Sequence, residues 1–90
     1  MSEADPVFEP LLGKRRTVRQ ALVEVAERWT TAPIEDPGVL AALEDAVRHK
    51  IRRGEIAGEI PPGTDAAVLA RAFIAALVVG KGLAVIELLP

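Results

Sequence analysis

The stretch from Thr64 to Leu89, TDAAVLARAFIAALVVGKGLAVIELL, constrains the fold more than any other part of this chain. Thr64 and Asp65 are residue types that cap the free N–H groups of a helix's first turn, and no proline follows them until Pro90. The many alanines of the stretch also favour helix. The sequence therefore predicts one long helix from Asp65 to Leu89.

This predicted helix is hydrophobic on nearly every side. At 100° per residue its apolar side chains fall on three sides, and only Arg71, Lys81 and Glu87 interrupt them. Such a helix must be covered on more than one side, and a 90-residue chain has little material to do so. We expect part of the cover to come from a second copy or another protein. A bilayer span would need roughly 20 apolar residues, whereas the charge-free run covers only 72–80, so no membrane association is expected.

Composition points to one all-α domain. Half of the residues are hydrophobic but only 3% are aromatic, so the core is built from Ala, Val, Leu and Ile, which suits helix-on-helix packing.

The net charge of −2 gives no general attraction to nucleic acid. The absence of cysteine and the single histidine exclude a disulfide, a thiolate site and a multi-histidine metal site, so no metal or cofactor is expected. The acidic, proline-broken start is no signal peptide, which favours a cytoplasmic protein.

Two further helices precede the long one. Thr17 and Gln20 match a capping box, and an apolar stripe follows to Trp29, which predicts a helix over 17–30. Asp36 before Pro37 starts a second helix. Gly54 and Gly58 are both possible stops, and we expect the helix to continue to about Ala57 and to stop at Gly58. The stripe of the first helix comprises Val18, Ala21, Leu22, Val25, Ala26 and Trp29, and the apolar face of the second comprises Val39, Leu40, Leu43, Val47 and Ile51.

The predicted fold is thus all-α: an antiparallel bundle of three main helices that completes a four-helix bundle in a homodimer. Residues 1–16 are expected to form a flexible lead-in, although Val7, Phe8, Leu11 and Leu12 give it apolar side chains that can dock on the core. The domain proper is expected to span 17–90.

No group of residues supports catalysis, so we predict that the chain is not an enzyme. His49 has Asp45 one turn before it, but both lie on the polar side of their helix, and the only serine is Ser2. The basic run over 14–19 suits a phosphate backbone, and a solvated helix start explains it better. Gly80 inside a helix indicates a helix crossing, either within the chain or between subunits.

The second half of the chain resembles the C-terminal regulatory domain of TetR-type transcriptional repressors. The resemblance rests on three segments: an Asp36-Pro37 helix start, the turn Arg53-Gly54-Glu55-Ile56-Ala57-Gly58-Glu59-Ile60, and the hydrophobic helix from Asp65 to Gly80. Residues 18–30, ending near Trp29, are similar to the helix that precedes these in the family. The likeness covers about Thr17 to Pro90.

The resemblance implies a ligand-sensing and dimerisation domain, in which the last two long helices of each subunit form a four-helix bundle. The dimer-interface residues it implies are Leu40, Leu43, Val47, Phe73, Leu77, Gly80 and Ala84. The candidate residues for binding a small apolar effector are Leu22, Val25 and Trp29, and a plain core role is the alternative for Trp29.

The family reads DNA with an N-terminal helix-turn-helix domain, for which 16 residues are too few. No direct DNA binding is therefore expected, and a homodimer or a mixed dimer with a related regulator is the expected assembly. The alternative is a stand-alone helical dimerisation or interaction protein with no effector.

Overall fold

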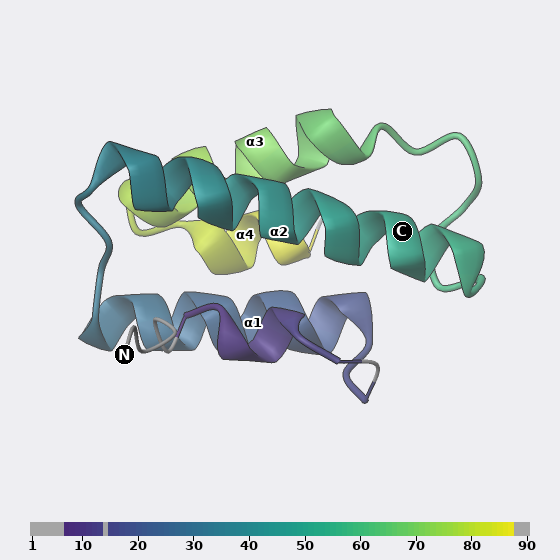
Figure 1. Cartoon of the computed structure of the whole chain (residues 1–90), viewed down its shortest axis with the longest axis horizontal. Helices are drawn as coiled ribbons and strands as arrows, with labels where there is room; N and C mark the ends of the chain where they lie inside the picture. Colours follow the sequence, from purple (N-terminus) through teal and green to yellow (C-terminus); the bar gives the residue numbers. More distant parts are fainter. Residues whose placement is uncertain (1–6, 14, 88–90) are drawn as a thin grey trace.

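The computed structural model describes residues 7–13 and 15–87, and it is all-α as predicted, with no strand in this part of the chain (Figure 1). A short 3-10 helix, η1 (Glu9–Leu11), precedes four α-helices. These are α1 (Val18–Thr31), α2 (Pro37–Ile56), α3 (Ala66–Val78) and the single-turn α4 (Gly82–Ile86). Three of them are long, which confirms a bundle of three main helices.

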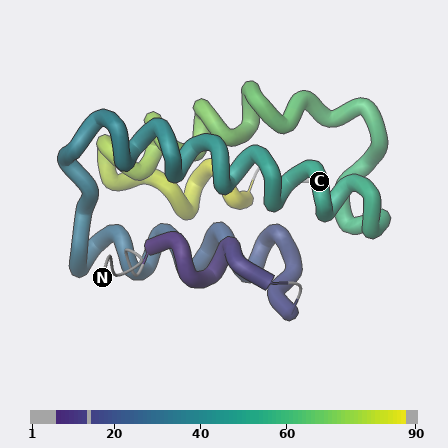
Figure 2. Tube along the Cα trace, in the orientation of Figure 1, coloured from purple at the N-terminus to yellow at the C-terminus, as the bar shows by residue number. Residues whose placement is uncertain are grey.

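Consecutive long helices run antiparallel. The trace in Figure 2 passes along α1, returns along α2 and reverses again into α3, and the short α4 then folds back beneath α2. Helix α3 packs against α2 and α4, while α1 packs against η1 and α4. The core therefore lies between α1 on one side and the α2–α3 pair on the other, with α4 closing the space between them.

The helix starts are set by side chains that the sequence analysis identified. Thr17 Oγ1 accepts a hydrogen bond from Gln20 N at 3.1 Å, and Gln20 Oε1 accepts one from Thr17 N at 3.0 Å, which completes the capping box. Asp36 Oδ1 accepts from the backbone N–H of Gly38 at 2.8 Å, with Pro37 at the first helical position. Asp65 likewise caps α3. These three predicted starts are confirmed.

Helix α2 also ends where the sequence indicated. Its last residue is Ile56, and Gly58 takes a left-handed backbone conformation with φ of +84°. Glu59 N donates to Gly54 O at 2.8 Å and Gly58 N donates to Glu55 O at 3.2 Å, which is the paired pattern of a Schellman C-cap. Gly54 therefore lies inside the helix rather than at its end.

The single helix predicted from Asp65 to Leu89 is wrong. Helix α3 ends at Val78, because Gly80 adopts a φ of +79° and the chain reverses there. Lys81 N donates to Ala76 O at 2.7 Å and Gly80 N donates to Leu77 O at 3.0 Å, so the same C-cap that ends α2 ends α3. Gly80 is a helix terminator and not a crossing point within the chain, since a Cβ placed on it would meet nothing within 4 Å.

The reversal lets the chain cover its own most hydrophobic helix. Gly82 begins α4 close to α3. A Cβ added to Gly82 would lie 2.7 Å from Leu77 Cδ2 and 3.4 Å from Cβ of Ala26 on α1. Ile86 on α4 is 2% exposed. Part of the cover that was expected from a partner thus comes from α4.

The core draws on every element, including the segment before α1. Val7 is fully buried and Leu11 is 2% exposed, both within the same hydrophobic cluster as the helices. Val7, Pro10 and Leu11, which fall in the lead-in predicted over residues 1–16, therefore belong to the core. Residues 1–6 and 14 lie outside the described residues. None of the described helices combines the length and hydrophobicity that a bilayer span needs.

Candidate interaction surface

The outward side of α3 is apolar and lacks cover from the described chain. While α3 buries residues such as Phe73 and Leu77, Val68 remains 62% exposed, Val78 60% and Val79 67%. Arg71 is the one charged residue on this side. We call this surface the α3 face, and its exposed residues are Ala67, Val68, Arg71, Ala72, Ala75, Val78 and Val79. A solvent-facing helix side normally carries several charges, so this surface is typical of an interaction site.

A groove of about 570 Å³ runs beside the α3 face, between α3 and α2. The lining from α2 is Ala41, Glu44, Asp45 and Arg48, and the lining from α3 and its cap is Asp65, Ala67, Val68, Arg71 and Ala72. On the α2 wall, Arg48 is already ion-paired with Asp45. Arg71, on the opposite wall, forms no ion pair with any residue that the structure describes.

Four of the six apolar residues of the α3 face have a symmetric spacing. Val68, Ala72, Ala75 and Val79 follow each other at intervals of four, three and four residues, so the series reads the same from either end. An antiparallel copy of α3 would set Val68 opposite a valine and Ala72 opposite an alanine. Alanines at the centre permit close approach of two helix backbones, and self-complementarity is what a two-fold interface requires.

The predicted dimer-interface residues lie mostly on the other side of these helices. Leu43 and Val47 of α2 are fully buried, Phe73 is 1% exposed and Leu77 is 2% exposed. The chain itself covers these four side chains, so in this structure they pack in its core and not on its surface. The most hydrophobic side of each helix is the side that the chain uses for its own core.

The remaining three predicted interface residues have accessible surface. Leu40 is half-buried against the core cluster, whereas Gly80 and Ala84 are exposed near the α3–α4 turn. The sequence analysis did not single out the α3 face. The signal that could have found it is the series of small apolar residues from Val68 to Val79, once Asp65 and Gly80 are taken as the limits of a short helix.

Trp29 borders a second groove, whereas the other two predicted ligand residues do not. Leu22 is 1% exposed and Val25 is fully buried, so both belong to the core and cannot contact a ligand in this structure. Trp29 is 9% exposed and lines a groove of about 470 Å³ between α1 and the α3–α4 turn. We call it the Trp29 groove, and its lining is Ala26, Glu27, Trp29, Thr30, Leu77, Gly80, Lys81, Gly82, Leu83 and Ala84.

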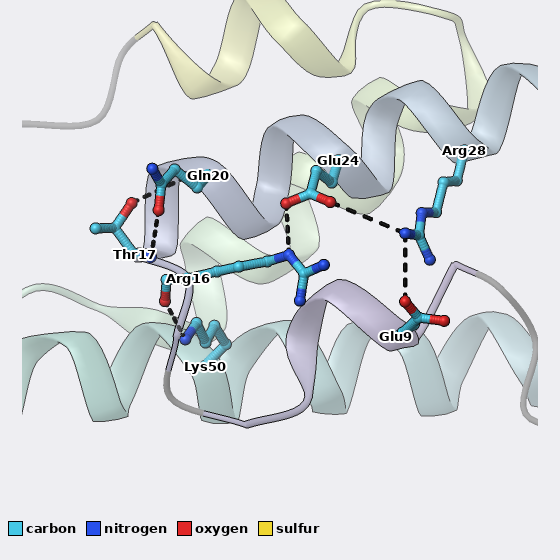
Figure 3. A network of polar contacts seen from close by, with 7 residues as sticks. All are labelled: Glu9, Arg16, Thr17, Gln20, Glu24, Arg28 and Lys50. Atoms are coloured by element: carbon cyan, nitrogen blue, oxygen red, sulfur yellow. Dashed lines mark hydrogen bonds and ion pairs between the residues drawn. The ribbon is translucent and has the colours of Figure 1, made fainter.

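A polar network joins α1 to the segment before it (Figure 3). Arg16 Nε lies 2.5 Å from Glu24 Oε2, and this contact raises the pKa of the Arg16 guanidinium. Arg28 Nη2 lies 3.5 Å from Glu9 Oε1 and 3.9 Å from Glu24 Oε1. The network includes the i,i+4 pair Glu24–Arg28, and it joins α1 to Glu9 of η1 and to Arg16.

Within the described part of the chain, no three His, Asp or Glu side chains lie together as a metal site would require. No protein-family model, no curated protein and no solved structure matches this chain.

Proposed function

We propose that this chain is a helical dimerisation module that associates with a second copy through the α3 face. The observation that carries the proposal is the exposure of Val68 and Val79 on a helix side with one charge. Burying such a surface is favourable by about 25 cal/mol per Å² of apolar area, so contact between the exposed valines of two copies lowers the free energy.

The symmetric spacing favours a second copy over an unrelated partner. In an antiparallel pair centred between Ala72 and Ala75, each Val68 packs on Val79 of the second copy. The charges beside the face are compatible with this arrangement, because Glu44 on the α2 wall and Arg71 on the α3 wall have no ion-pair partner among the described residues of their own chain. A second copy therefore brings an opposite charge toward each wall.

Cysteine cross-linking tests this interface directly, because the chain contains no cysteine of its own. Ala72→Cys places one thiol near the proposed two-fold axis, and mild oxidation should then yield a disulfide-linked dimer at low protein concentration. Leu12→Cys is the matched control, since Leu12 is exposed but lies before α1 and away from the α3 face. Equal cross-linking of the two variants would reflect random collision and would contradict the proposed interface.

Sensing of a small apolar molecule is the second candidate function, and the Trp29 groove favours it. This groove joins α1 to the α3–α4 turn, so an occupant would contact the two elements whose packing closes the core. The resemblance to TetR-type regulatory domains gives the same expectation. Trp29 is the only tryptophan and lines this groove, so an occupant of the groove should change the emission of the protein. A saturable emission change with an uncharged aromatic compound would support sensing, and an unsaturable change would oppose it.

A further inference from the structure

Lys50 is a buried cation on α2. Lys50 is 4% exposed, and its Nζ donates a hydrogen bond to the backbone oxygen of Arg16 at 2.6 Å (Figure 3). One turn further along, Arg53 Nη2 donates to Leu11 O at 2.9 Å. Both acceptors are neutral backbone carbonyls, and neither cation forms an ion pair with any described residue. Two positive charges are thus held at one place without a paired anion.

These two cations line a pocket of about 320 Å³ at the C-terminal end of α2. The other lining residues are Gly13, Gly54, Ile56, Ala57 and Glu59. Glu59 contributes the one carboxylate, but its Oε1 accepts a hydrogen bond from Val18 N at 2.9 Å and so serves the start of α1. The carbonyls at the end of α2 are already occupied by the backbone N–H groups of Gly58 and Glu59.

The local electrostatics leave the pocket short of negative charge. Burial is the main cause that lowers the pKa of Lys50, and the neighbouring Arg53 lowers it further, with Glu59 acting in the opposite direction. A buried ammonium group near a second cation is costly to keep charged. An incoming anion would remove this penalty, because it would supply the missing opposite charge.

We propose that this pocket binds an oxyanion, a phosphate or carboxylate group, through Lys50 and Arg53. An ammonium group has three donors and a guanidinium group has five, so each residue retains donors after its bond to a backbone oxygen. The exposed side chain of Ile56 and the neighbouring Ala57 form an apolar rim, which suits an organic acid or a phosphate ester. The pocket shares no lining residue with the α2–α3 groove, so the proposal is independent of dimerisation.

Titration of the intact chain with inorganic phosphate and with acetate, at ionic strength held constant with sodium chloride, tests this site. Amide resonances of Gly13 and Gly54 should shift saturably with at least one of the two anions. Lys50→Met and Arg53→Met should each weaken binding by about tenfold or more, the effect of losing a charged hydrogen-bond donor. Arg52→Met is the matched control, because Arg52 is exposed on the same helix outside this pocket. It should bind as the wild type does.

The two anions also distinguish the possible sources of the oxyanion. Tighter binding of phosphate assigns the site to a phosphorylated ligand, and tighter binding of acetate assigns it to a carboxylic acid. If neither anion shifts the Gly13 and Gly54 resonances, the proposal is wrong, and Lys50 and Arg53 only hold the segment before α1. An equal loss in Arg52→Met would also contradict it, because binding would then follow overall charge.

Discussion

Gly54 of α2 lies against Val18 of α1 so closely that an added Cβ would stand 2.3 Å from Val18 Cγ2. Glycine inside a helix normally costs about 1 kcal/mol relative to alanine. Here it allows the end of α2 to reach the start of α1, where Glu59 and Lys50 then bond to the same segment. The end of α2 is therefore held against the start of α1 at this contact.

We predict that Gly54→Ala destabilises the protein despite its better helix propensity. The overpacking should outweigh the propensity gain and lower the free energy of unfolding by about 1–3 kcal/mol, measured by urea denaturation. Val18→Ala in the same background removes the clashing Cγ2 and should recover part of the loss. A Gly54→Ala variant as stable as the wild type would show that α1 and α2 are not in this close contact.

The α3–α4 reversal predicts a second glycine effect with a different cause. Gly80 has open space around it but a φ of +79°, so Gly80→Ala should cost about 1–2 kcal/mol through backbone strain alone. Thermal unfolding would measure this, with Gly58→Ala as the comparison, since Gly58 has the same open surroundings and a φ of +84°. A stabilising effect of Gly80→Ala would instead support one continuous helix through this position.

On the α3 face, Val68→Glu should break the dimer and leave the fold intact. Val68 is 62% exposed, so the single chain loses little packing, whereas in the dimer the new carboxylate would be buried against a valine of the second copy. Sedimentation velocity should show a dissociation constant raised by about tenfold or more. Leu12→Glu, at a position 61% exposed, should leave association unchanged. Equal effects of the two substitutions would rule out the α3 face as the interface.

Lys50 predicts a pH dependence of stability. Its pKa is lower in the folded chain than the ordinary value of 10.5. At a pH between the folded-state pKa and 10.5, folding therefore releases protons, and the stability contributed by this group rises as pH increases toward 10.5. The charged groups that act on it are Arg53, Glu59 and Arg16. Compared with Lys50→Met, the wild type should gain free energy of unfolding as pH is raised from 7 toward 10.5. A difference that does not change with pH would contradict the lowered pKa.

Local signals in the sequence predicted most of the secondary structure. Thr17, Asp36 and Asp65 marked helix starts correctly because each cap acts over three residues, and Gly58 marked a stop for the same reason. The α3–α4 break was missed because Gly80 is compatible with a helix interior as well as a helix end. Tertiary contacts of Gly82 with Leu77 and Ala26 favour the break, and the contact with Ala26 depends on a residue far away in the sequence.

The site residues were harder to predict than the helices. Hydrophobic periodicity shows which sides of a helix avoid water, but it does not distinguish burial within one chain from burial between two. Leu43 and Phe73 were assigned to a dimer for that reason and proved to be core residues. The pairing of Lys50 with Arg16 O joins residues 34 positions apart, and no local pattern carries that information.

The solution mass of the wild-type chain, measured by size-exclusion chromatography with light scattering over a range of concentrations, tests the central claim most directly. A dimer that pairs through the α3 face predicts twice the mass of the 90-residue chain, with a shift toward the single-chain mass on dilution. A single-chain mass at every concentration would contradict the account. The α3 face would then be an exposed surface without a second copy as its partner.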